Sequence, residues 1–105
     1  MHSAIVQSSV IVSFKSRALK RFWERGDERH LPSQFVAKIT LVLDALDAAT
    51  TPGDLDLPGF GFHRLKGSRR GQYSIFVTHN WRITFRWRDG DAVEIDFLDY
   101  HGESR

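Results

Sequence analysis

Apolar residues near the start of the chain change from a strand-like to a helical spacing. Residues 10–14 read V-I-V-S-F, a β-rich apolar run that predicts a mostly buried strand. Ser16 follows as a candidate N-cap of a helix that Gly26 ends. The apolar stripe of this helix is formed by Ala18, Leu19, Phe22 and Trp23.

A second helix is predicted from Ser33, another candidate N-cap, to about Ala49, because the T-T-P-G run at residues 50–53 breaks it. Its apolar positions recur at helical spacing: Phe35, Val36, Ile39, Val42, Leu43 and Leu46. Two amphipathic helices with a short polar connection indicate a helical hairpin. Their apolar stripes need a sheet to pack against.

The second half of the chain predicts strands. After a loop at residues 50–61 that is rich in Asp, Pro and Gly, strand patterns cover residues 62–65, 72–78, 81–88 and 92–98. Asp89-Gly90 is a strong hairpin signal before the last strand. The order β-α-α-β-β-β-β predicts an α+β fold, with an antiparallel sheet and both helices on one of its faces.

The strand at residues 81–88 alternates strictly between two kinds of side chain. Its apolar face carries Trp81, Ile83, Phe85 and Trp87, and its other face carries Arg82, Thr84, Arg86 and Arg88. We expect the apolar face to meet the helices. The opposite face then presents arginines that can hold a phosphate backbone.

Composition narrows the class of protein. The chain has 105 residues, of which 41% are hydrophobic and 27% charged, as in a globular protein. We expect a single domain over residues 1–105, with residues 1–9 as a loose start. The absence of cysteine excludes disulfides, Cys-ligated zinc and thiol chemistry. No apolar run is long enough for a membrane span and no secretory signal is apparent, so we expect a cytoplasmic protein.

The net charge of +2 hides an uneven distribution. Residues 44–61 contain four acids and no Lys or Arg, and residues 89–103 contain six acids and no Lys or Arg. Between them, residues 62–88 contain no acid and seven basic residues: Arg64, Lys66, Arg69, Arg70, Arg82, Arg86 and Arg88. Clustered basic charge is typical of a surface that binds polyanions. The alternative is a basic strand pair neutralised by its acidic neighbour.

One set of residues has the inventory for RNA cleavage without a metal. His63 and Lys66 lie at the end of one strand, and Asp99, Tyr100 and His101 follow the last strand. The two histidines titrate near neutral pH and can exchange protons with the ribose 2′-hydroxyl and the leaving 5′-oxygen. Lys66 and Arg82 can stabilise the charge of the phosphorane.

Each of these residues also has a structural explanation. His63 suits a solvated strand, Tyr100 suits a core position, and Arg82 can pair with Asp96 or Glu94. A metal site is not expected, because HxH and HExxH motifs are absent. The histidines at positions 2, 30 and 79 are interpreted as incidental.

Five segments in order resemble the HigB-type toxins of the RelE/ParE superfamily of bacterial toxin–antitoxin systems. They are LDAATTPGDLDLPG (residues 46–59), FHRLKG (62–67), GQYSIFV (71–77), NWRITF (80–85) and DYH (99–101). The resemblance covers residues 10–101, and no motif position is substituted. About nine residues before the first strand and residues 102–105 depart from the family pattern.

The resemblance implies a ribosome-dependent endoribonuclease that cleaves mRNA in the ribosomal A site, without a cofactor or metal, in the cytoplasm. It implies a helix-turn-helix antitoxin, HigA-like, as partner, besides the ribosome with its 16S rRNA and the mRNA, and no membrane. Carried over by motif, the catalytic residues are His63, Lys66, Arg82, Asp99, Tyr100 and His101. Contacts to RNA or the ribosome fall to Arg64, Arg69, Arg70, Asn80, Arg86 and Arg88.

Two other functions remain open from the sequence. A ParE-like protein has this fold but inhibits DNA gyrase without catalysis, and would not need the His, Lys, Arg and Asp-Tyr-His set. A basic module that binds RNA or a partner would dock through its sheet and cleave nothing.

Overall fold

The computed structural model describes residues 10–100. Its two α-helices are α1 (Arg17–Arg25) and α2 (Val36–Ala48). Its four strands are β1 (His63–Arg64), β2 (Gln72–Phe76), β3 (Trp81–Arg88) and β4 (Asp91–Asp99). Three short 3-10 helices connect these elements: η1 (Ser33–Phe35), η2 (Pro52–Leu55) and η3 (Gly67–Arg69).

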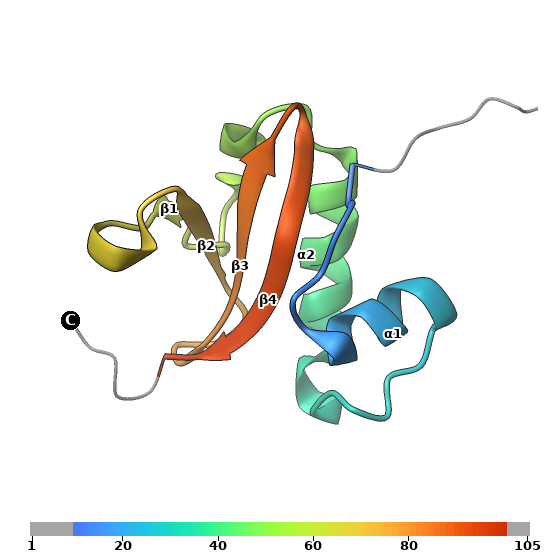
Figure 1. The fold of residues 1–105 in the computed structure, drawn as a ribbon. Helices are drawn as coiled ribbons and strands as arrows, with labels where there is room; N and C mark the ends of the chain where they lie inside the picture. Colours follow the sequence, from blue (N-terminus) through green and yellow to red (C-terminus); the bar gives the residue numbers. More distant parts are fainter. Residues whose placement is uncertain (1–9, 101–105) are drawn as a thin grey trace, which may run out of the picture.

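The four strands form an antiparallel sheet in the order β1-β2-β3-β4, as the consecutive hairpins predicted (Figure 1). The predicted bounds of β3 match the structure, and the other three strands shift by one or two residues at their ends. Asp89 and Gly90 both have positive φ, 54° and 84°, in the turn between β3 and β4. Such a turn suits the twist of the two strands that it joins.

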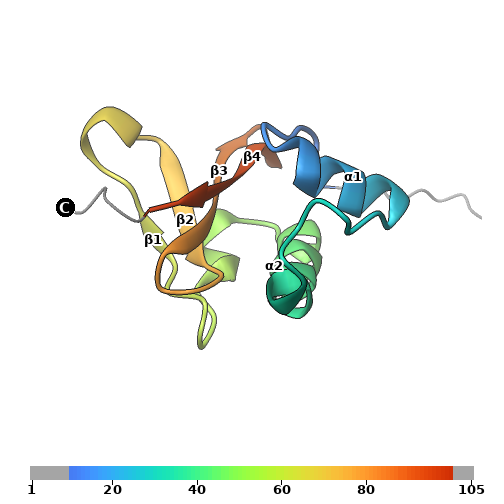
Figure 2. The same ribbon diagram turned by 90° about the horizontal axis from the view of Figure 1, so that it is seen from below.

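The two helices take different places on this sheet (Figure 2). Helix α2 covers one face, whereas α1 lies beside β4 at the sheet edge. The caps of α1 follow the prediction, since Leu19 N–H donates to Ser16 Oγ at 3.1 Å and Gly26 adopts φ 70°. Ser33 is different: it opens η1, and no side chain caps that turn before α2 begins at Val36.

The segment at residues 10–14 forms two isolated parallel bridges to β4, Ile11 with Ala92 and Phe14 with Ile95, in place of the predicted regular strand. A bulge in β4 explains the interruption. The β3–β4 register shifts between Thr84 and Arg86, and Glu94 has φ 54°. Its N–H donates to the Ser13 hydroxyl at 2.9 Å rather than to a backbone carbonyl.

The hydrophobic core lies between α2 and the sheet. Residues of α2 meet residues of β2, β3 and β4, all of them less than 1% exposed: Ile39, Val42, Leu43, Leu46, Ile75, Ile83, Phe85 and Ile95. Each such side chain contributes about 1.5–3 kcal/mol on burial. Because side chains alternate along a strand, this packing leaves Phe76, Arg82 and Arg86 on the sheet face away from α2. Within residues 10–100, neither helix has the length and hydrophobicity to cross a membrane.

Candidate active site

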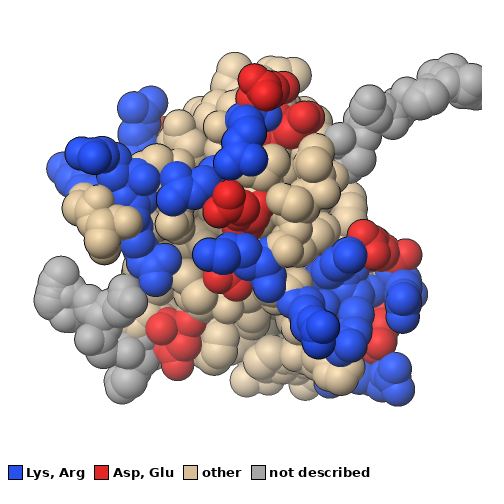
Figure 3. All heavy atoms as spheres, in the orientation of Figure 1, with Lys and Arg blue, Asp and Glu red and all other residues tan. Residues whose placement is uncertain are grey.

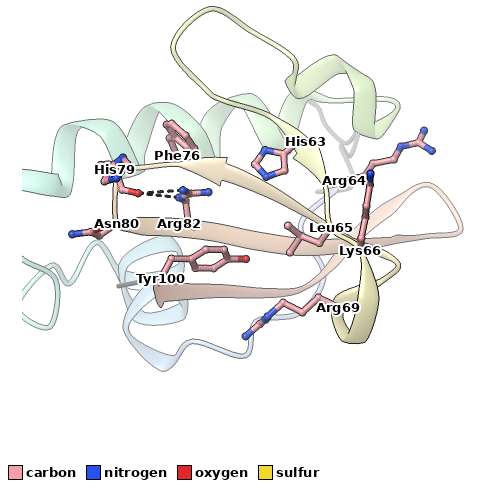
Figure 4. A pocket seen from close by; sticks show the side chains of 10 residues that line it. All are labelled: His63, Arg64, Leu65, Lys66, Arg69, Phe76, His79, Asn80, Arg82 and Tyr100. Atoms are coloured by element: carbon pink, nitrogen blue, oxygen red, sulfur yellow. Dashed lines mark hydrogen bonds between the residues drawn. The ribbon is translucent and has the colours of Figure 1, made fainter. Parts of the chain in front are cut away.

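An open hollow of about 650 Å³ lies on the sheet face away from α2, near the end where β1, β2 and β3 meet the residue after β4 (Figure 4). Side chains from four segments line it. They are His63, Arg64, Leu65, Lys66, Arg69, Phe76, His79, Asn80, Arg82 and Tyr100. Residues that are far apart in sequence, with His63 and Tyr100 at the extremes, thus share one surface as predicted.

The guanidinium of Arg82 is held between two aromatic rings. Its Cζ lies 4.2 Å from the centroid of Phe76 and 4.8 Å from that of Tyr100. Phe76 is the register partner of Arg82 on the neighbouring strand. The Arg82 Nη2 and Nε donate to the His79 carbonyl at 3.2 and 3.4 Å. Aromatic faces attract a guanidinium while leaving its in-plane N–H groups available for an anion.

Tyr100 is fixed at its backbone, where its N–H donates to the Asn80 carbonyl at 2.7 Å. This bond ties the residue after β4 to the turn between β2 and β3. The Tyr100 hydroxyl is buried and has no hydrogen-bond partner among the described residues. The ring therefore serves as a wall for Arg82 and keeps an unused polar group inside the hollow.

His63 is exposed at the other side of the hollow, with Nδ1 3.0 Å from the Gly61 carbonyl. A carbonyl oxygen only accepts hydrogen bonds, so this contact assigns the proton of a neutral ring to Nδ1. The lone pair is then on Nε2, which can accept a proton from a substrate.

The electrostatic character of the hollow is uniformly basic. Four of its lining residues are permanent or near-permanent cations, two are histidines, and Asp and Glu are absent from the lining. Lys and Arg gather over the β1 and η3 side of the molecule (Figure 3). Arg82 makes no ion pair with any residue of the described part of the chain, so the alternative pairing with Asp96 or Glu94 is not found. A site of this charge attracts anions such as phosphate.

Other predicted residues lie outside the hollow. Arg86 and Arg88 both pair with Glu94, at 3.3 and 3.4 Å, so part of the arginine face is neutralised. Thr84, between Arg82 and Arg86 on the same face, is 1% exposed, whereas the alternation predicted an open position. Arg70 is exposed and its carbonyl accepts from Arg86 at 3.5 Å. Asp99 is exposed and is the register partner of Trp81.

His101, a predicted catalytic residue, lies outside the described residues. The catalytic and RNA-binding roles assigned from sequence all stay predictions. Among residues 10–100, no three His, Asp or Glu side chains come close enough to suggest a metal-binding group.

Three lining residues were missed by the sequence interpretation: Leu65, Phe76 and His79. Phe76 was read only as part of an apolar strand, and His79 was read as incidental. The strand register could have found the last two, because Phe76 is directly opposite Arg82 and His79 precedes it in the connecting turn.

Comparison with known proteins identifies the family. The model of the RelE-like toxins HigB of type II toxin–antitoxin systems matches residues 12–101. "Endoribonuclease HigB" of Proteus vulgaris is 44% identical over 92 residues, which cover 88% of this chain and all of that protein. "Toxin HigB-1" of Vibrio cholerae serotype O1 is 38% identical over 93 residues, which cover 86% of this chain and 96% of that protein.

Two solved structures share the fold at low sequence identity. A copper-bound mutant toxin from Helicobacter pylori has a TM-score of 0.50 and 10% identity, covering 87% of this chain and 94% of its own. A mutant of YafQ from E. coli has a TM-score of 0.50 and 14% identity, covering 90% and 99%. The family match and the curated relatives extend over nearly all the described residues, and the chain belongs to the HigB-like toxins, RelE-like toxins of type II toxin–antitoxin systems.

Proposed function

We propose that this toxin is an endoribonuclease that cleaves mRNA in the ribosomal A site by metal-free general acid–base catalysis. The observation that carries the proposal is the clamped Arg82 guanidinium in a hollow lined by cations and histidines and by no acid. A phosphodiester is the anion that such a site suits, because its charge is spread over oxygens that guanidinium N–H groups can bind. The Proteus vulgaris relative, named an endoribonuclease, supports the same chemistry.

The reaction is a transesterification. The ribose 2′-oxygen forms a bond to phosphorus and the bond from phosphorus to the 5′-oxygen breaks. One histidine takes the 2′-hydroxyl proton and the other protonates the leaving 5′-oxygen. His63, with its lone pair on Nε2, and His101 share these two transfers. The products are a 2′,3′-cyclic phosphate, which can open to a 3′-phosphate, and a 5′-hydroxyl.

Lys66 and Arg82 hold the scissile phosphate and stabilise the additional negative charge of the phosphorane. Asp99 orients or polarises one of the histidines. Tyr100 stacks on a base of the A-site codon, since unstacked RNA bases bind aromatic side chains.

The ribosome supplies what this small site lacks. The hollow is open, so it cannot by itself hold an mRNA in the geometry for in-line attack. We expect the ribosome to hold the mRNA in this geometry, which lowers the entropic cost of reaching the transition state. The family also implies a cognate antitoxin, which we propose to be a helix-turn-helix protein, and the toxin would act in the cytoplasm.

The test is cleavage of a defined mRNA by the purified toxin, with and without 70S ribosomes. We expect cleavage only with ribosomes, and end mapping should find 5′-hydroxyl and cyclic phosphate termini. A metal-activated water would leave a 5′-phosphate instead. Arg82→Ala should lose cleavage by at least about a hundredfold, whereas Arg29→Ala should cleave normally because Arg29 pairs with Asp27 at 2.9 Å, outside the hollow.

Cleavage of free mRNA at the same rate would refute the ribosome requirement. Replication arrest with gyrase damage and intact mRNA in expressing cells would support the ParE-like function instead. Ribosome binding without any cleavage would leave only a docking role.

A further inference from the structure

Helix α1 has a basic outer surface that the site does not use. Arg17, Lys20 and Arg25 are exposed and Arg21 is half-buried, whereas the inner side of α1 buries Leu19 in the core. In Figure 3, Lys and Arg gather with some acidic residues at the lower right, where Figure 1 places α1, away from the basic area over β1 and η3. We call Arg17, Lys20, Arg21 and Arg25 the α1 strip.

The α1 strip is not neutralised inside the protein. None of its residues forms an ion pair within residues 10–100, although other surface arginines do. Arg29 pairs with Asp27, and Arg86 and Arg88 pair with Glu94. Glu24 is the one acidic residue in the sequence of α1. A net of three positive charges therefore remains on the nine residues of α1, about two and a half turns of helix.

The placement of these charges does not serve helix stability. The first turn of α1 contains no acid and begins with Arg17. A cation near a helix N-terminus opposes the helix dipole, at a cost of about 0.3–1 kcal/mol. Only Arg25, in the last turn, interacts favourably with the dipole. The helix dipole therefore does not account for the cations at the start of this helix.

The geometry of the α1 strip fits a phosphate backbone. Its four cations and Glu24 surround a hollow of about 180 Å³. Arg17, Arg21 and Arg25 recur every four residues, so their backbones are about 6 Å apart along the helix. The large hydrophobic side chains that are exposed in the described part of the chain are Val12, Leu41 and Leu57, and none is on α1. The core of a protein–protein interface is depleted of charged residues, whereas the hollow on this surface is lined by charged residues.

We propose that the α1 strip binds the sugar–phosphate backbone of ribosomal RNA, as a second contact separate from the catalytic hollow. The inference rests on the proposed action at the ribosome. It requires no base recognition, because cations of this kind read only the phosphates.

The test is binding of the purified toxin to 70S ribosomes without mRNA, at several salt concentrations. In the triple variant Arg17→Gln, Lys20→Gln and Arg25→Gln, glutamine keeps helix propensity and most of each side chain. We expect its Kd to rise at least about tenfold and the slope of log Kd against log salt to fall by about two to three. Two matched controls separate the strip from net charge: Glu24→Gln should bind more tightly, and Arg29→Gln should stay within about twofold.

Wild-type affinity and salt slope in the triple variant, with an unchanged melting temperature, would overturn the inference. Retained ribosome binding with lost binding of the cognate antitoxin would also overturn it and assign the strip to a protein interface. The proposed function can fail without the inference. If the wild-type toxin binds ribosomes through the α1 strip but leaves mRNA intact, the proposed cleavage is refuted and the RNA contact of the strip stands.

Discussion

At the scale of single residues, the position of Arg82 depends on Phe76, whose ring lies 4.2 Å from the guanidinium carbon. Phe76→Leu removes the cation–π contact and lets the guanidinium move. Such a contact contributes about 0.5–2 kcal/mol, so kcat for ribosome-dependent cleavage should fall about twofold to thirtyfold. Phe76→Tyr keeps an aromatic ring beside the guanidinium and should keep most of the wild-type kcat. A role in packing alone would not require an aromatic ring at this position.

A matched substitution separates this effect from stability. Phe62→Leu removes a ring that stacks on Tyr73 at 5.6 Å and forms no ring or cation–π pair with Phe76, Arg82 or Tyr100. If Phe62→Leu and Phe76→Leu lower the melting temperature equally and also lower kcat equally, Phe76 does not position Arg82.

Gly61 links the clamp to His63. Its carbonyl accepts from His63, and a Cβ added to it would lie 2.8 Å from the Phe76 ring, at φ 54°. Gly61→Ala should therefore disturb both groups and reduce cleavage more than it reduces stability. Gly26→Ala is the control: it has φ 70° and open space around its Cβ, so it carries backbone strain of about 1 kcal/mol without touching the site. If the Gly61→Ala and Gly26→Ala variants cleave equally at a temperature where both are folded, Gly61 has no specific effect on the site.

The residues of the site were predictable from the sequence only where they belong to a motif of the toxin family. The resemblance to the toxin family singled out His63, Lys66, Arg82 and Tyr100, which the structure brings to one hollow. Phe76 carries no polar group, so its role became visible only from register and distance.

At the scale of elements, η2 depends on a carboxylate. Asp54 accepts hydrogen bonds from the backbone N–H and hydroxyl of Thr50 and from the N–H of Thr51, and these lower its pKa below 3.8. A carboxyl whose pKa is depressed in the folded state stabilises it above the unfolded pKa, and this stability is lost as the pH falls through the folded pKa.

Asp54→Asn should therefore lower the urea midpoint at neutral pH, and the difference in midpoint from wild type should narrow as the pH falls below the ordinary pKa of an aspartate, about 4. Asp56→Asn is the control, because the exposed Asp56 side chain makes no hydrogen bond or ion pair to residues 10–100. A gap that is constant with pH would mean that the carboxylate charge plays no part.

Elements with a strong local pattern were predictable, and elements that depend on distant partners were not. Strict alternation defined β3, and Ser16 with Gly26 defined α1. The segment at residues 10–14 has strand composition, but its pairing depends on a bulge at Glu94, more than eighty positions away. The place of α1 at the β4 edge is also a tertiary outcome that its amphipathic stripe does not encode.

At the scale of the whole molecule, the α+β order and the basic block at residues 62–88 were predictable from the sequence. How the cations of this block divide between surfaces became visible only in the structure. The seven cations of residues 62–88 do not act as one surface: Arg82 faces the hollow, whereas Arg86 and Arg88 pair with Glu94. The prediction of a single domain over residues 1–105 extends beyond the described residues and stays a prediction. The α1 strip lay outside the block and was not singled out.

Two basic surfaces on separate elements should act together if one ribosome spans both. Arg64 and Arg70 are exposed on the β1 and η3 side of the molecule, and the α1 strip lies beyond β4, at the opposite edge of the sheet (Figure 1). Distant sites with no shared partners contribute additively. We expect the free-energy losses and salt slopes of the double variant Arg64→Gln with Arg70→Gln and of the α1 triple variant to sum in the combined protein, measured as Kd for 70S ribosomes. If the combined protein binds ribosomes as tightly as one of the two variants from which it is built, the two surfaces serve different partners. Simultaneous contact with one ribosome requires the affinity losses of both variants to appear in the combined protein.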